Sequence, residues 1–174
     1  PSPSLSLVLI CRFAHAPAAS SVRSPQFDIL WPQLTVRETL KFYAQIKGLP
    51  AEAWEAEATR AARSVELLHA QHRQVARLSG GMKRRVSFAI ALIAQPRVIF
   101  LDEPTTGLDP ETKRHMWGLV DAAKAGRSII LTTHSMEEAD ALSNRIGIMA
   151  YGALRYVALP PKPSCHMPEA SLSR

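Results

Sequence analysis

The stretch that decides the fold is "LSGGMKRRVSFAIALIAQPRVIFLDEPTTGLDP", residues 78–110. Ser79 and two glycines precede a helical pattern in which Val86, Ile90 and Ile93 share one side, which predicts a buried helix capped by Ser79. The next apolar run, "RVIFLD" at 97–102, is short, continuous and ends in a carboxylate. Such a run is typical of a central parallel strand that is covered on both faces.

The segments after this stretch continue an alternation of helices and strands. A helix is expected from Pro110 to about Ala125, followed by a strand at 128–134, a short helix at 136–142 and a strand at 145–150. This alternation predicts an α/β fold with a parallel sheet.

Two helices are expected before residue 78. Thr35 and Glu38 have capping-box spacing, and the helix that they start ends at Gly48. Pro50 then begins a second helix, which the apolar spacing extends over 51–70. These helices and the one after Ser79 predict a helical subdomain.

Composition excludes several classes of protein. The 174 residues suit one folded domain, and 47% hydrophobic residues are ordinary for a globular chain. No apolar run approaches the roughly 18 residues that a membrane span needs. The net charge of +6 is scattered, and its tightest cluster, Lys83 to Arg85, is interpreted as a solvated helix face, so we expect no nucleic-acid partner. Cys11 and Cys165 lack metal-ligand spacing and fit a reducing compartment.

Two acids at the end of the buried run are candidates for chemistry. Open α/β sheets bind ligands at the carboxyl ends of their strands, which is where Asp102 and Glu103 would lie. Asp102 could hold magnesium and Glu103 could face an attacking water. The alternative is that both acids merely cap the following helix.

Two further features point to the same edge. Ser79, Gly80 and Gly81 would present N–H groups at a helix N-terminus, which is a natural seat for a phosphate or else a plain helix cap. His134 follows the next strand and would reach the same edge as Glu103, although a lone histidine is usually structural.

These motifs together resemble the nucleotide-binding domain of ABC transporters. Gln26 resembles the Q-loop, Ser79 to Met82 the signature motif, "VIFLDEP" the Walker B strand, "GLD" the D-loop and His134 the switch histidine. Their order over residues 25–152 excludes coincidence. The sequence around Gln26 most resembles subfamily A, a group associated with lipid export. Met82, where the commonest signature has glutamine, points to the same subfamily.

The resemblance implies a role for each matched residue. Glu103, His134 and Gln26 would be catalytic, Asp102 and Gln26 would hold magnesium, and the signature residues Ser79, Gly80, Gly81 and Met82 would bind ATP held by a second domain. The D-loop residues Gly107, Leu108 and Asp109 would meet that domain. The expected cofactors are ATP and Mg²⁺.

The resemblance also predicts the organisation of the chain. We expect an unmatched arm at 1–24, a partial P-loop NTPase-like domain at 25–152 and a disordered tail at 153–174 that begins with one short strand. Within the domain, the helical subdomain covers about 35–95 and the core from Walker B to the switch histidine about 96–152. The arm could add one short strand at 5–10.

The Walker A pattern G-x-x-x-x-G-K-[ST], whose N–H groups and lysine bind the phosphates, should precede Gln26. The first lysine is Lys41 and the first glycine is Gly48, so these 174 residues contain no such pattern before Gln26. We expect the sheet to lack a neighbouring strand, with "SLSLVLI" as a candidate replacement, and the isolated chain to be inactive. The first residue is Pro1 rather than Met, which suggests a fragment.

The leading hypothesis is therefore part of an ATP-driven transporter, at the cytoplasmic face of a membrane beside transmembrane domains and a second nucleotide-binding domain. Expressed alone, the chain would be soluble and cytosolic. Three alternatives stay open: a regulatory partner that docks by its signature motif, a soluble ABC protein of ribosomes or DNA repair, and a truncated product without a function of its own.

Overall fold

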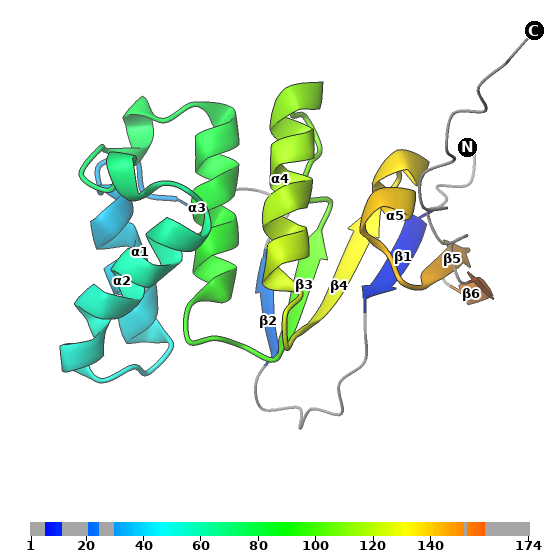
Figure 1. Ribbon diagram of the computed structural model, residues 1–174, viewed down its shortest axis with the longest axis horizontal. Helices are drawn as coiled ribbons and strands as arrows, with labels where there is room; N and C mark the ends of the chain where they lie inside the picture. The colour runs from blue at the N-terminus through cyan, green and yellow to red at the C-terminus, as the bar shows by residue number, and fades with distance from the viewer. Residues whose placement is uncertain (1–5, 12–20, 25–29, 152, 159–174) are drawn as a thin grey trace, which may run out of the picture.

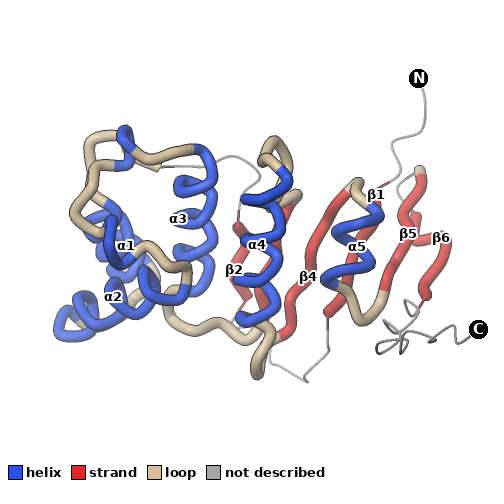
Figure 2. Tube along the Cα trace, turned by 45° about the horizontal axis from the view of Figure 1, so that its top comes forward, coloured by secondary structure: helices blue, strands red, loops and turns tan. Residues whose placement is uncertain are grey.

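The computed structural model describes residues 6–11, 21–24, 30–151 and 153–158. In this part of the chain, a six-stranded mixed sheet has the order β2-β3-β4-β1-β5-β6 (Figure 1). The helices α1, α2 and α3 gather beside the β2 edge, while α4 and α5 lie over one face of the sheet (Figure 2). The architecture is the predicted α/β fold with a helical subdomain.

The parallel part of the sheet contains β2 (Ser21–Ser24), β3 (Val98–Asp102) and β4 (Ser128–Thr133). The strands β3 and β4 were predicted from their apolar runs. The strand β2 was not predicted, because its four residues, "SVRS", carry neither an apolar run nor an alternating pattern. It pairs with β3 alone and forms one edge of the sheet.

The predicted short strand in the arm exists as β1 (Ser6–Cys11). It pairs antiparallel with both β4 and β5 (Ile146–Ala150), so it fills the position between them. The candidate replacement strand is thus part of the sheet, with a direction opposite to that of β4. The last strand, β6 (Ala153–Ala158), confirms the short strand predicted at the start of the tail, and it forms a hairpin with β5. The domain boundaries stay predictions.

The first helix has the predicted boundaries, and the second is shorter than predicted. Thr35 and Glu38 form the capping box of α1 (Val36–Ile46). The helix α2 covers Trp54–Ser64, and single turns of 3₁₀ helix flank it at 51–53 and 68–70. It ends because Glu66 adopts a φ of 57°, while the N–H of the buried Leu67 donates to the carbonyl of Ala62. This is a Schellman-type end without its usual glycine, so no residue type in the sequence marks the end of the helix.

The signature helix α3 (Gly80–Leu92) connects the helical subdomain with the sheet. Lys47, the residue directly after α1, binds the end of this helix, because its Nζ donates to the carbonyl oxygens of Ile90 and Ile93 at 2.6 and 3.1 Å. Burial of this ammonium lowers the pKa of Lys47 to about 8. The Glu57 carboxylate of α2 accepts the N–H of Ala94 at 2.7 Å, directly after the helix. Side chains from the end of α1 and from α2 thus fix the end of α3.

Among the described residues, helices cover one face of the sheet. The helices α4 (Pro110–Ala123) and α5 (Met136–Leu142) lie over one face, and the alternate residues Ile99, Leu101, Ile129 and Leu131 are buried. Burial of each such side chain contributes about 1.5–3 kcal/mol of stability. Phe100 points to the opposite face and is 37% exposed.

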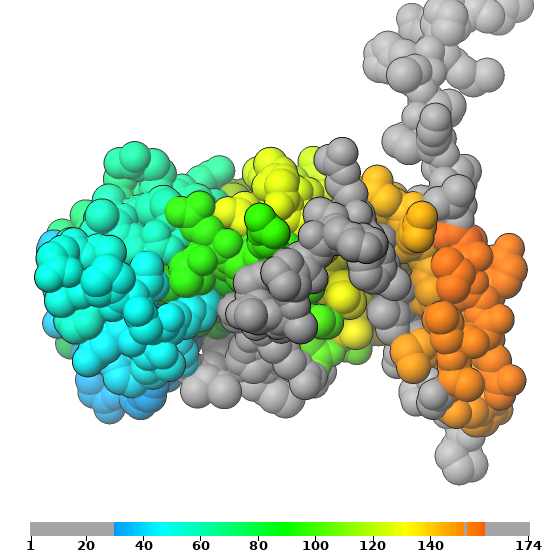
Figure 3. All heavy atoms as spheres, turned by 90° about the horizontal axis from the view of Figure 1, so that it is seen from below, coloured from blue at the N-terminus to red at the C-terminus, as the bar shows by residue number. Residues whose placement is uncertain are grey.

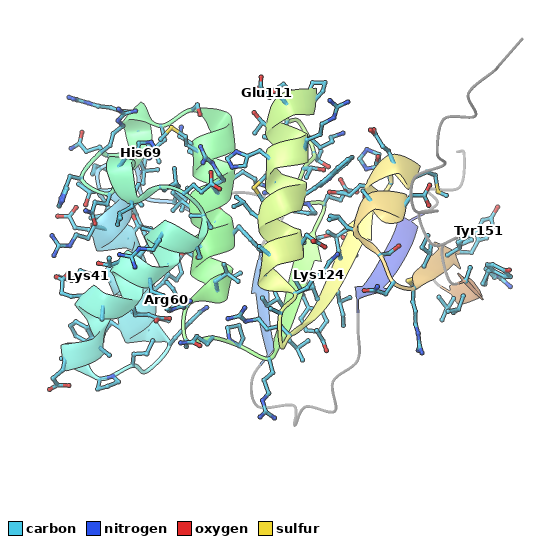
Figure 4. All side chains as sticks on the ribbon, in the orientation of Figure 1. Lys41, Arg60, His69, Glu111, Lys124 and Tyr151 are labelled. Carbon is cyan, nitrogen blue, oxygen red and sulfur yellow. The ribbon has the colours of Figure 1, made fainter. Side chains whose placement is uncertain are left out.

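The ends of the long axis carry different surfaces. The space-filling view shows the helical subdomain at one end and the β5–β6 hairpin at the other (Figure 3). Tyr151 stands at the hairpin turn and points outward (Figure 4), and Leu154, Tyr156 and Val157 are also exposed. Within the described residues, no helix has the length and apolar character needed to cross a bilayer.

Candidate functional site

The sequence-predicted residues from 79 to 134 gather at one edge of the molecule. The strands β3 and β4 run parallel, so Asp102 and Thr133 end them on the same side. The helices α3 and α4 begin there too, and Figure 4 shows Glu111, in the first turn of α4, on the upper side of the view. This edge combines carboxylates with helix N-termini.

Asp102 is held by the neighbouring strand. It lies opposite Thr132 in the β3–β4 register, and the Thr132 hydroxyl donates to Asp102 Oδ1 at 2.5 Å. The side chain is half-buried. The threonine thereby fixes the direction of the carboxylate at the end of β3.

Glu103 is fixed at both its backbone and its side chain. Its φ is 43°, a left-handed conformation that few non-glycine residues adopt, and its N–H donates to the Thr132 carbonyl at 3.0 Å. The Thr106 hydroxyl donates to Oε2 at 2.9 Å, and Oε1 lies 3.3 Å from Nδ1 of His134. The Glu103 side chain is 28% exposed and that of His134 is 63% exposed, so both reach solvent. A carboxylate and an imidazole in contact can together accept a proton from a water molecule and pass it on.

The start of α3 offers N–H groups. Ser79 caps the helix, and its hydroxyl oxygen accepts the N–H of Met82 at 3.2 Å. The N–H groups of Gly80 and Gly81 donate to no acceptor in the described part of the chain. A Cβ at Gly80 would meet nothing within 4 Å. With the positive end of the helix dipole, these groups can bind an anion.

The D-loop residues connect this helix start with α4. Gly107 has a φ of 78°, which favours glycine, and Leu108 packs on the core. Asp109 caps α4, because its carboxylate accepts the N–H and the hydroxyl of Thr112 at 2.9 and 2.7 Å. The hydrogen bonds from Thr112 hold the pKa of Asp109 below its usual value. A Cβ at Gly81 would lie 2.5 Å from Thr112 Cγ2, so α3 and α4 touch at this glycine.

Gln26 lies outside the described residues, so its roles in catalysis and magnesium binding stay predictions. Between the described side chains there is no cluster of three or more potential metal ligands. Magnesium at phosphates usually takes only one or two carboxylates, together with phosphate oxygens and water. Asp102 fits one such position, because it reaches the edge as a single oriented carboxylate.

Three contacts of the site were not predicted. Thr132 binds both Asp102 and Glu103, and the register that brings it there is invisible before the strands are paired. Glu138 of α5 is 1% exposed, and its Oε1 accepts from the Thr105 hydroxyl at 2.8 Å and from Trp117 Nε1 at 3.1 Å. It therefore joins the loop after β3 to α4 and α5.

The third contact corrects the interpretation of the basic cluster. Lys83 to Arg85 were interpreted as a solvated helix face, but Arg84 is only 8% exposed. Its guanidinium binds carbonyls of the loop that carries Glu103. An arginine at an inward position of an apolar helix was the available signal, because buried charges need partners.

Comparison with known proteins agrees with this geometry. The family model described as ABC transporter matches residues 14–106, and its match begins inside the segment predicted as an unmatched arm. ABC transporter A family member 2 of Arabidopsis thaliana is 54% identical over 133 residues, which are 76% of this chain and 14% of that protein. ABC transporter A family member 9 of the same plant is 55% identical over the same shares. ABC transporter A family member 7 of Dictyostelium discoideum is 52% identical over 133 residues, 76% of this chain and 16% of that protein.

The chain therefore belongs to the ABC transporter family, within subfamily A, and its fold is part of that family's ATPase domain. ATPase domains of this family bind ATP and magnesium. The chain spans 14% of the length of the Arabidopsis relatives named above, so the activity of a whole transporter is a proposal for this chain. The roles of the individual site residues stay predictions.

Proposed function

We propose that this chain contributes the signature side and the acidic edge of ATP sites in an ATP-driven transporter. The energy of hydrolysis would move a substrate across a membrane, and subfamily A favours a lipid as that substrate. The observation that carries the proposal is the Glu103 carboxylate, held between the Thr106 hydroxyl and the His134 ring at the carboxyl end of β3. A carboxylate in this place can orient and deprotonate a water.

Each residue then has a task in an in-line phosphoryl transfer. Glu103 polarises the attacking water, His134 contacts the γ-phosphate, and Asp102 with Gln26 holds magnesium. Magnesium held by these residues would supply positive charge that neutralises the phosphate oxygens. The N–H groups of the α3 N-terminus bind phosphate oxygens of a nucleotide that another domain holds. Catalysis of this kind is positioning and electrostatic stabilisation.

A second nucleotide-binding domain is the proposed partner for this task. The 174 residues carry no Walker A pattern before Gln26, so we propose that they do not hydrolyse ATP by themselves. The signature residues Ser79 to Met82 would complete a site whose Walker A belongs to the second domain. Glu103 and His134 would serve the site built on a Walker A of their own domain.

Transmembrane domains are the other proposed partner, which would place the chain at the cytoplasmic face of a membrane. An exposed aromatic cluster supports this docking. Trp31 is 41% exposed and packs edge-on against Phe42 of α1, with ring centroids 4.7 Å apart. Phe42 is 36% and Ile46 62% exposed on the same helix. Exposed apolar groups of this kind mark contact surfaces for other proteins.

The test combines the purified chain with a complete subfamily A domain whose own signature motif has been inactivated. Magnesium-dependent ATP hydrolysis should be absent for either protein alone and should appear when both are mixed. Gly80→Asp in the chain should abolish it, because a carboxylate at the helix start repels phosphate, whereas the neutral Gly80→Asn is the size-matched control. Glu103→Gln should leave it unchanged, since this glutamate serves the other site.

Two results would contradict the proposal. Tight ATP binding by the folded chain alone, measured by calorimetry, would mean that a phosphate cradle exists within these residues. Unchanged hydrolysis with Gly80→Asp would mean that the start of α3 does not face the nucleotide.

A further inference from the structure

One buried arginine ties the signature helix to the loop that carries Glu103. Arg84 lies in the second turn of α3, and its side chain reaches across to the end of β3. Its Nε donates to the Pro104 carbonyl at 2.7 Å, and its Nη2 lies 2.6 Å from the Glu103 carbonyl and 3.4 Å from that of Asp102. Three successive carbonyls therefore converge on one guanidinium.

This convergence matches the unusual backbone of the loop. Glu103 adopts a φ of 43°, and a left-handed residue at a strand end turns the chain sharply. The turn directs the carbonyl of Glu103 toward α3, while its N–H donates to the Thr132 carbonyl of β4. The loop is thus held from both sides, by β4 and by α3.

The side chain of Glu103 depends on this backbone. Its carboxylate lies 3.3 Å from His134 Nδ1 and accepts the Thr106 hydroxyl at 2.9 Å. If the carbonyl contacts with α3 were lost, the turn would relax and the carboxylate would leave the imidazole. An arginine suits this task better than a lysine, because its planar fork reaches several acceptors at once.

We propose that Arg84 is a positioning residue for Glu103. It holds the left-handed turn through the carbonyls of residues 102–104. The direction of the Glu103 carboxylate therefore depends on the position of α3. The importance of this carboxylate direction for catalysis rests on the proposed function. Any shift of α3 at its phosphate-facing start is then transmitted to the acid within the same domain.

The test uses NMR signals of the His134 ring in the purified 174-residue chain without nucleotide, assigned with a His134→Asn variant. Glu103→Gln replaces a charged acceptor beside Nδ1 with a neutral one, so it should shift these ring signals. In an Arg84→Met background, the same substitution should produce little of that shift. Arg84→Lys should lose part of it, because one ammonium cannot bind all three carbonyls.

Arg85→Met is the matched control on the same helix. Arg85 Nη1 contacts the Val65 carbonyl at 3.4 Å, away from the acidic loop, so this background should keep the full shift. Circular dichroism checks that each variant is folded, and if Arg84→Met unfolds, the comparison of Arg84→Lys with Arg85→Met decides. A full shift in the folded Arg84 variants would overturn the proposal. Because no nucleotide is present, failure of ATP binding or hydrolysis leaves this result unaffected.

Discussion

The contact between Gly81 and Thr112 gives a prediction with a defined size. A Cβ on Gly81 would lie 2.5 Å from Thr112 Cγ2, whereas carbon atoms in contact prefer about 3.5–4.0 Å. Thr112 cannot turn away freely, because its hydroxyl donates to Asp109 Oδ1 at 2.7 Å and its methyl position follows from that bond. Gly81→Ala therefore has to separate α3 from α4 or break the cap of α4, at a cost of about 1–3 kcal/mol.

Gly80→Ala measures the stability that alanine adds to the helix without a clash, because a Cβ at Gly80 meets nothing within 4 Å. Replacing a helical glycine by alanine gains up to about 1 kcal/mol, so Gly81→Ala should be less stable than Gly80→Ala by about 1–3 kcal/mol. Thr112→Ser removes the clashing methyl and keeps the hydrogen bond to Asp109. By itself it should cost about 1 kcal/mol or less.

The assay is urea unfolding followed by circular dichroism, applied to wild type, both glycine variants, Thr112→Ser and the double variant Gly81→Ala/Thr112→Ser. The double variant should recover most of the loss, which is a favourable coupling of about 1–2 kcal/mol. Equal stability of the two glycine variants would refute the contact. Additive losses in the double variant would show that the methyl of Thr112 is not the obstacle.

Three further predictions concern stability and use the same unfolding assay. The pKa of Lys47 is lowered from the ordinary 10.5 to about 8, so between these pH values the unfolded chain binds more protons than the folded one. The free energy of unfolding should therefore rise with pH by about 1–2 kcal/mol over that window, less than the full shift would give because the group is partly hydrated. A similar rise in Lys47→Met would contradict this cause. Glu138→Ala should cost about 2–4 kcal/mol, because it leaves the buried Thr105 hydroxyl and the half-buried Trp117 Nε1 without their acceptor, whereas Glu138→Gln should cost less than about 1 kcal/mol. Equal losses in the two variants would contradict these hydrogen bonds. Thr35→Ala should cost about 1 kcal/mol through loss of the α1 cap, and no loss would mean that the hydrogen bond to the Thr35 side chain does not stabilise α1 in solution.

The sequence predicted those parts of the fold that depend on local patterns. The capping box at Thr35, the cap at Ser79 and the run at 97–102 each define an end or a strand through neighbours in the chain, and α1, α3 and β3 follow them closely. The end of α2 was missed, because Glu66 takes a place that glycine usually fills. Its conformation is set by burial of Leu67 in the core, which local propensity does not contain.

The residues of the candidate site were likewise predicted only where local patterns define them. The sequence placed Asp102, Glu103 and His134 at one edge, because the carboxyl ends of parallel strands meet there. It did not find Thr132 or Arg84, since their contacts depend on strand register and on the rotation of a helix against the sheet. Such long-range geometry decides which polar group of a helix faces a loop.

The position of β1 has a consequence for the order in which the protein can assemble. Among the described strands, β5 and β6 join the ladder of the sheet only through β1, which pairs with β4 on its other side. Leu9 is paired in register with Leu131 and Ile146, so its partners are translated roughly 120 and 140 residues later. At about 5–20 residues per second, β1 waits roughly 6–24 seconds for β4. During synthesis β1 is thus complete long before either of its neighbours, and the six described strands cannot form one ladder until β5 has been made.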